Sequence, residues 1–183
     1  KTKNALIVTN RPAIANSWFD DFQKFIAWQE PHMKFVSETD ALSGKAMTRA
    51  QYREHLDTAT NPSQITFISL QDLKGAKFAG GRHEKLDWVV GLDWDILVID
   101  EAHEGIDTKK TDRAFSQIKR KFTLHLSGTP FKALANNKFR EEQIFNWSYV
   151  DEQQAKEDWD ETIGSNPYES LPTLNLFTYQ MSK

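Results

Sequence analysis

The sequence contains no cysteine among its 183 residues, which excludes disulfides and thiolate metal sites and suits a reducing compartment. It has no apolar run near the roughly 18 residues that span a bilayer. The apolar run near the N-terminus is too short for a secretory signal. The formal net charge is −3, so any binding of nucleic acid has to be local. We therefore expect a cytoplasmic protein with no membrane partner.

Short apolar runs are the clearest structural signal that the sequence does contain. They are continuous rather than alternating, which is typical of strands buried on both faces of a parallel sheet. Such a sheet has to be covered by helices, so the runs predict an α/β fold with a mostly parallel sheet. The predicted strands are 5–9, 65–70, 96–100 and 122–127.

Helical patterns separate the predicted strands. In the stretch 13–28, apolar residues recur at spacings of three and four, which predicts a helix with one face in the core. Its core stripe consists of Ile14, Trp18, Phe22, Phe25 and Ile26. Further helices are predicted at 48–56, 111–122 and, as a polar surface helix, at 151–163.

Three other segments bear on how the chain is organised. The stretch 74–85 is rich in glycine and basic residues and is expected to be a mobile surface loop. We expect one domain over 1–163. The segment 164–183 opens with turn residues and prolines and then turns apolar. It is either a last strand or the exit toward another domain, and the pattern leaves both open.

Two adjacent carboxylates end the clearest strand. The run ILVI leads directly into Asp100 and Glu101, and His103 follows after Ala102. Ligands of an open parallel sheet bind beyond the carboxyl ends of its strands. At that place one acid can hold Mg²⁺ through water beside substrate phosphates, and the other can orient a water for attack on phosphorus. The alternative is a solvated acidic loop.

The next strand also runs into polar residues. The stretch LHLSGTP places the hydroxyls of Ser127 and Thr129 at the same predicted edge as Asp100. Alone, this stretch is equally compatible with a turn that ends a strand. Because LSGTP comes one predicted strand after Asp-Glu-Ala-His, the two stretches together form a specific pair of motifs.

These two motifs, VIDEAH and LSGTP, resemble motifs II and III of the superfamily-2 helicases and translocases. The DEAH spelling and the downstream FKALANNKF and QIFNWSYVDEQ are most similar to the helicase subunits of restriction systems. ALIVTNRPAIANSW resembles motif Ia and TFISLQDL resembles motif Ib, in the order that the family has. The resemblance spans Ala5 to Val150 and implies a three-layer RecA-like domain, the first of two in such motors.

The resemblance also implies roles for individual residues. Asp100 would hold the water shell of Mg²⁺, Glu101 would orient the hydrolytic water, and His103 would couple to motif III through Ser127 and Thr129. Contacts to a nucleic-acid backbone would come from motifs Ia and Ib. Those contacts fall on Asn10, Arg11, Ser69 and Gln71, with an exposed loop charge as the alternative for Arg11 and a strand-end cap for Ser69 and Gln71.

A P-loop is absent from these residues. ATP binding in this family needs G-x-x-x-x-G-K-[ST], and Gly44–Lys45 is followed by Ala46 and has Thr39 where the first glycine should stand. We also expect that pair to lie on a helical stretch rather than after a strand. We expect an excised piece of the first motor domain that lacks its opening strand and helix. By itself it would be inactive and prone to self-association through an open sheet edge.

The sequence thus predicts part of a nucleic-acid-dependent ATPase motor that uses Mg²⁺ and ATP. DNA is favoured over RNA as its partner, together with a second RecA-like domain of the same protein. One alternative is a non-hydrolysing scaffold or nucleic-acid-binding domain that kept the fold. Another is a metal-dependent phosphoesterase built on Asp100, Glu101 and His103, which would need further ligands at other strand ends.

Overall fold

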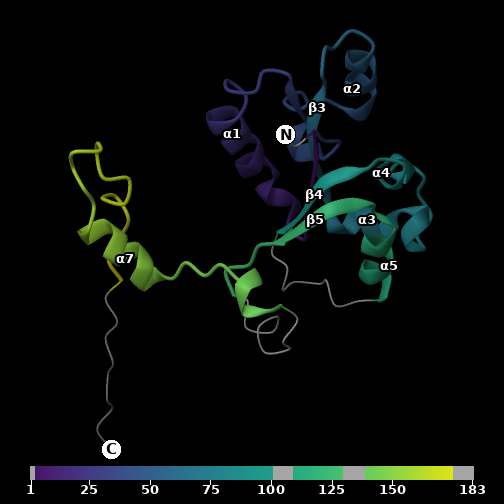
Figure 1. Cartoon of the computed structure of the whole chain (residues 1–183). Coiled ribbons are helices and arrows are strands. Elements are labelled where there is room, and N and C mark those ends of the chain that lie inside the picture. Colours follow the sequence, from purple (N-terminus) through teal and green to yellow (C-terminus); the bar gives the residue numbers. More distant parts are fainter. Residues whose placement is uncertain (1–2, 101–108, 130–138, 175–183) are drawn as a thin grey trace, which may run out of the picture. The chain divides into compact units, whose positions relative to one another are not determined.

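The chain divides into two compact units, Lys1–Asn136 and Asn137–Lys183. A computed structural model describes residues 3–100, 109–129 and 139–174 (Figure 1). The first unit contains the sheet and its covering helices, and the second is a smaller helical unit. Every strand end discussed below belongs to the first unit.

The first unit is built on a five-stranded sheet in the order β2-β3-β1-β4-β5, and all its described pairings are parallel. This arrangement confirms the predicted α/β class with a parallel sheet. The strands are β1 (Asn4–Thr9), β2 (Met33–Val36), β3 (Ser63–Ser69), β4 (Trp94–Asp100) and β5 (Arg120–His125).

The helices of the first unit are short. Thr48, the first residue of the helix predicted at 48–56, caps α2 through a capping box with Gln51. The α-helices are α1 (Ala15–Phe25), α2 (Arg49–Leu56), α3 (Leu70–Gly75), α4 (Asp87–Val90) and α5 (Lys109–Gln117). Single 3₁₀ turns lie at η1 (Pro12–Ile14), η2 (Asp40–Leu42) and η3 (Lys77–Ala79).

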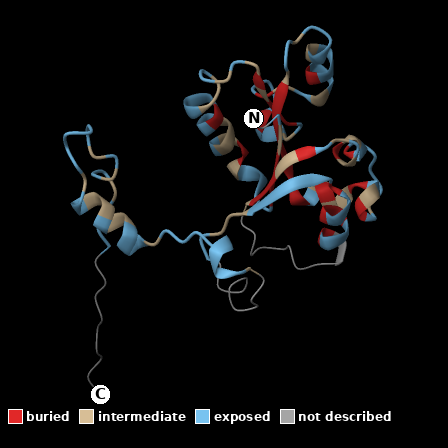
Figure 2. Cartoon of the chain, in the orientation of Figure 1, coloured by how far each residue is buried: buried red, intermediate tan, exposed pale blue. Residues whose placement is uncertain are grey.

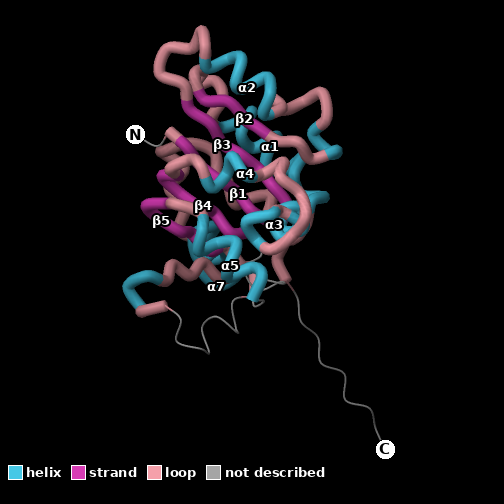
Figure 3. The backbone as a smooth tube through the Cα atoms, turned by 90° about the vertical axis from the view of Figure 1, so that its right-hand side faces the viewer, coloured by secondary structure: helices cyan, strands magenta, loops and turns pink. Residues whose placement is uncertain are grey.

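The sheet has one hydrophobic core on each face. On one face, Phe22 of α1 packs with Phe35 and Phe67 of the strands. On the other face, residues of α3, α4 and α5 pack around Leu97 and Trp94 of β4. Figures 1 and 3 show the sheet lying between α1 and the group α3, α4 and α5. The sheet is therefore the middle layer of three.

Coverage of the sheet is uneven. The inner strands β3 and β1 are buried over most of their length, whereas β5 is exposed along nearly all of its residues (Figure 2). Phe122 lies beside Ile96 in the strand register, and its side chain is 69% exposed. Among the described strands, β5 forms one edge of the sheet. An exposed edge of this kind can pair with another chain.

Three local predictions are wrong. The segment 74–85 is not simply a loop, because Ala76 and Ala79 are buried and Ala76 pairs with His83. The helix predicted at 111–122 ends at Gln117, since residues 120–125 form β5. The residues around Gly44 form a turn rather than a helix, and Gly44 has a φ of +73°, which favours glycine.

Glycine is required at one position of the segment 74–85. A Cβ on Gly81 would lie 2.1 Å from the carbonyl oxygen of Gly75. The backbone turns back on itself there, and the amides of Arg82 and His83 both donate to that same oxygen. This close approach explains why the segment packs against the core despite its loop-like composition.

The second unit contains η4 (Glu141–Gln143) and α7 (Tyr149–Glu157). Ser148 caps α7 by accepting from the amide of Asp151, and no residue of the helix is buried. The predicted polar surface helix is therefore confirmed, although it starts and ends earlier than the pattern suggested. The ring of Tyr168 contacts Trp147 and Trp159, and these aromatic contacts supply the packing of this unit.

Candidate functional site at the carboxyl edge of the sheet

The carboxyl ends of three neighbouring strands lie side by side. In the strand register, Thr9 at the end of β1 lies between Ser69 at the end of β3 and Asp100 at the end of β4. The end of β5, the next strand in the sheet, lies beside β4, where His125 pairs with Ile99. The structure thus brings the ends of four predicted strands to a single edge, as parallel pairing requires.

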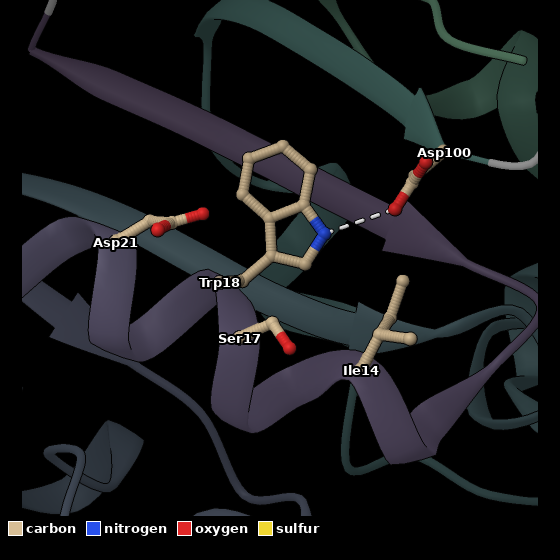
Figure 4. A pocket seen from close by; sticks show the side chains of 5 residues that line it. All are labelled: Ile14, Ser17, Trp18, Asp21 and Asp100. Carbon is tan, nitrogen blue, oxygen red and sulfur yellow. Dashed lines mark hydrogen bonds between the residues drawn. The ribbon is translucent and has the colours of Figure 1, made fainter. Parts of the chain in front are cut away.

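Asp100 is held at this edge by a side chain from α1. The indole Nε1 of Trp18 donates a hydrogen bond of 2.9 Å to Oδ2 of Asp100 (Figure 4). Both residues line a pocket of about 260 Å³ that also includes Ile14, Ser17 and Asp21. A carboxylate that a neutral donor orients is well placed to face a ligand in that pocket.

The pocket wall is one stripe of the α1 segment. Ile14, Ser17, Trp18 and Asp21 are three, four and seven residues apart, so they point to one side of the helix. Sequence reasoning assigned Trp18 to the core stripe and missed its bond to Asp100. The available signal was chemical, because a partly buried indole N–H needs an acceptor. Phe25, also assigned to the core stripe, is 54% exposed.

The other residues of the stretches that resemble motifs II and III are described only in part. Glu101 and His103 lie outside the described residues. Ser127 is half-buried and accepts a 3.2 Å hydrogen bond on its Oγ from the backbone amide of Thr129. This contact closes a short turn just past β5, and Thr129 is exposed there.

Asn10 and Arg11 follow β1 directly, and both are exposed. The backbone amide of Arg11 donates to Oγ1 of Thr9 over 3.1 Å, and its carbonyl accepts from the amide of Ile14. The buried Thr9 therefore fixes the path of the chain between β1 and α1. The two polar side chains are left at the surface of the edge.

Ser69 is the N-cap of α3. Its Oγ accepts from the amide of Asp72 over 3.0 Å and donates to Oδ2 of Asp72 over 2.9 Å. The structure thus shows the strand-end cap that was the alternative interpretation of this residue. Gln71 lies in the first turn of α3 and is exposed.

Asp95 ties the strands together at their amino ends, opposite the candidate site. Its carboxylate accepts from the backbone amides of Lys3 over 2.7 Å and Asn4 over 3.1 Å, and it pairs with Nζ of Lys121 over 2.6 Å. These bonds, led by the one from Lys121, hold the pKa of Asp95 well below its ordinary value. Asp95 joins the amino ends of β1, β4 and β5, which aligns their carboxyl ends.

The chemistry of Asp100 fits a magnesium ion better than a softer metal. Mg²⁺ prefers oxygen ligands and is commonly held by one or two carboxylates, with water and substrate phosphates completing its shell. Within residues 3–100, 109–129 and 139–174, no three His, Cys, Asp or Glu side chains form a metal-binding cluster. Asp100 at the strand end suits an ion that arrives with its substrate.

In the described part of the chain, no helix has the length and apolar character needed to cross a membrane.

Comparison with known proteins identifies the family. The family described as "Type III restriction enzyme, res subunit" matches residues 1–132, which include the whole sheet and the edge that bears Asp100. One curated relative is a protein of Mycoplasma pneumoniae (strain ATCC 29342 / M129 / Subtype 1) named "Putative type II restriction enzyme and methyltransferase RM.MpnORF110P C-terminus". It is 26% identical over 219 aligned positions, which take in 97% of this chain but only 29% of the relative. The parallel sheet, the acid at the end of β4 and the match over most of the chain lead to one conclusion: the chain belongs to the family of type III restriction enzyme res subunits, a helicase-like family of superfamily 2 with a RecA-like fold.

Proposed function

We propose that this chain is part of the first motor domain of an ATP-driven translocase or helicase that acts on DNA in a restriction system. One observation carries the proposal. Asp100, the first residue of Asp-Glu-Ala-His, lies at the carboxyl edge of the sheet, in register with the ends of β1 and β3. In an open parallel sheet this edge is where a nucleotide binds.

Each residue of the edge has a proposed task. Asp100 holds water molecules of a magnesium ion, and Glu101 orients the water that attacks the γ-phosphate. When bound, Mg²⁺ neutralises charge that develops on the phosphates. His103 links this site to Ser127 and Thr129, so that the state of the nucleotide changes the strand end of β5.

DNA contacts are proposed for the loops that follow β1 and β3. Asn10 and Arg11 are exposed after β1, and Gln71 is exposed in the first turn of α3. They offer amide and guanidinium donors, and Ser69 adds a hydroxyl that would have to exchange its bond to Asp72 for one to a phosphate. Such groups contact phosphates without reading sequence. The restriction-enzyme name of the relative favours DNA over RNA.

A complete motor requires parts beyond these residues. The 183 residues contain no P-loop, and the chain spans 29% of the length of its curated relative. The proposal therefore includes a P-loop and a second RecA-like domain supplied by the same protein. The experiments that test it use the full-length protein.

The test measures ATP hydrolysis with and without double-stranded DNA. We expect hydrolysis that DNA stimulates, and we expect Glu101→Gln to lower the rate about 10²- to 10⁴-fold, because that range is typical for loss of a positioned base. Glu54→Gln, on the exposed face of α2, is the matched control and should leave the rate unchanged. DNA binding without hydrolysis would contradict the proposal and favour a scaffold role.

A further inference from the structure

We propose that Trp18 is a positioning residue for Asp100, which sets the orientation of the carboxylate that binds Mg²⁺ at the edge of the sheet. This inference rests on the proposed function. The indole donates to one carboxylate oxygen, Oδ2, over 2.9 Å. A carboxylate has two oxygens and about four acceptor sites, so this bond leaves the group able to accept further bonds. Fixing one oxygen therefore fixes the direction in which the other points.

The bond connects two distant parts of the chain. Trp18 and Asp100 are 82 residues apart, and they meet because β1 leads through η1 directly into α1, which packs against the sheet. Figure 4 shows the indole reaching from α1 to the end of β4 with its nitrogen toward Asp100. The donor thus comes from a regular helix, which is a more rigid support for a site than a loop.

The other tryptophans show how an indole N–H of this chain finds an acceptor when it positions no acidic side chain. Trp28 donates its indole N–H to the carbonyl of Lys24, and Trp94 donates to the carbonyl of Val89. Trp159 in the second unit likewise donates to the carbonyl of Gly164. These indoles are satisfied by backbone oxygens close in sequence. Trp18 instead donates to an ionisable side chain in a pocket, which is a charge-assisted bond.

The position of the pair also explains the partial burial of Trp18. Its ring packs against the core on the α1 face of the sheet, while its nitrogen points to the pocket that Asp100 lines. Packing therefore holds the ring in place, and the N–H sets the orientation of the Asp100 carboxylate. Trp18→Phe removes the N–H and leaves a smaller aromatic ring against the core, so the Mg²⁺ dependence of the rate is needed to separate the two contributions.

We expect Trp18→Phe in the full-length protein to raise the Mg²⁺ concentration for half-maximal ATP hydrolysis about 10- to 100-fold, the usual effect of losing a partner of a metal ligand. The rate at saturating Mg²⁺ should stay close to that of the unaltered protein. Trp28→Phe, the same change in a tryptophan that is 71% exposed, should leave the Mg²⁺ dependence unchanged. A lower rate that added Mg²⁺ does not restore would mean that Trp18 acts only through packing, and would overturn the inference.

A second measurement does not depend on activity. With 5-fluorotryptophan in the full-length protein, the ¹⁹F signal that is absent from Trp18→Phe belongs to Trp18. We expect Asp100→Ala to shift this signal and the other indole signals to stay in place. With an ATP analogue, Mn²⁺ should broaden the Trp18 signal more than the signals of Trp28 and Trp94.

The outcomes distinguish the inference from the function on which it rests. An unmoved Trp18 signal in Asp100→Ala would overturn the positioning role, while DNA-stimulated hydrolysis would still support the motor. A shifted signal in a protein that neither hydrolyses ATP nor shows Mn²⁺ broadening would preserve the contact and refute its role at a metal site. Both the shift and the raised Mg²⁺ requirement together support the inference.

Discussion

At the scale of single residues, Ser69 has a structural task and a proposed functional one. It caps α3 through Asp72, so Ser69→Ala should lower the free energy of unfolding by about 0.5–2 kcal/mol. Ser69→Asp places a negative charge where a DNA phosphate is proposed to bind, beside the carboxylate of Asp72. We expect Ser69→Asp to weaken DNA binding and to cost at least as much stability as Ser69→Ala, because the two carboxylates repel each other.

Thr48 provides the control for Ser69. It caps α2 in the same way, through the amide of Gln51, but has no proposed contact with DNA. Thr48→Ala should lose similar stability in chemical unfolding, and Thr48→Asp should bind DNA as the unaltered protein does. Equal DNA affinity for both aspartate variants would contradict a role for Ser69 in DNA binding.

Asp95 makes stability depend on pH. Its pKa in the folded chain is depressed below the ordinary 3.8 by the bonds from Lys121, Lys3 and Asn4. A depressed pKa means that the stabilisation is present above the unfolded-state pKa and is lost as the pH falls through the folded-state pKa. Asp95→Asn should therefore cost roughly 1–2 kcal/mol at pH 7, and this difference should shrink below about pH 4.

Urea unfolding of the chain and of Asp95→Asn at pH 7, 5 and 3 tests this dependence. Asp20→Asn is the control, because Asp20 is an exposed acid on α1. A cost of Asp95→Asn that is as large at pH 3 as at pH 7 would show that its carboxylate charge is not the source of the stability.

Residue patterns in the sequence predicted the place of Asp100, but they did not predict the side chain that orients it. Asp100 was predictable because an apolar run ends at it, and in a parallel sheet the ends of such runs share one edge. Trp18 was not, because its spacing on α1 is that of a core residue. Its partner lies 82 residues away, and only the folded sheet places that acid above the helix.

At the scale of elements, β5 is the open strand of the described sheet. Parallel strands are normally covered on both faces, yet Phe122 is 69% exposed and Leu124 is 44% exposed. We expect the chain to self-associate as its concentration rises, and we expect Phe122→Lys to reduce that association. Because the side chain is already exposed, the free energy of unfolding should change by no more than about 0.5 kcal/mol.

Sedimentation velocity over a range of concentrations measures this effect. Phe25→Lys is the matched control, since Phe25 is also exposed but lies on α1. A chain that stays monomeric at every concentration, or an equal effect of the two lysine variants, would contradict an association through β5.

The same physical features explain which elements were predictable. Strands β1, β3 and β4 carry continuous apolar runs of strand length, which are typical of buried strands. Strand β2 has only four residues, Met33–Val36, with a lysine in the middle, so its sequence does not distinguish it from a loop. The segment 74–85 was misread because the tight approach of Gly81 to Gly75 is invisible in its composition.

At the scale of the whole molecule, contacts at both ends of the strands organise the site. Asp95 ties three strands at their amino ends, and the register carries this alignment to Thr9, Ser69 and Asp100 at the other end. The acid at the end of β4 thus lies one strand away from the loop after β1 and two strands away from the loop after β3. A nucleotide bound beside β4 would be near the surfaces proposed to touch DNA.

The arrangement also predicts what these residues cannot do alone. The one Gly-Lys pair, Gly44–Lys45, lies in a turn after η2, and Nζ of Lys45 bonds to Oδ1 of Asn16 over 2.6 Å. It is followed by Ala46 rather than the Ser or Thr that binds Mg²⁺ in a P-loop. Most of the affinity for ATP comes from P-loop amides and their lysine. We therefore expect the 183-residue chain by itself to show no ATP hydrolysis above background.

Lys45→Ala in the full-length protein sharpens this prediction. If the P-loop is supplied by another part of the protein, this variant should hydrolyse ATP at the normal rate, whereas Glu101→Gln should not. Both rates are measured with saturating DNA and Mg²⁺. Turnover by the isolated chain that vanishes in its own Glu101→Gln variant would contradict the prediction. It would mean that the edge formed by β1, β3 and β4 binds and cleaves ATP without a P-loop.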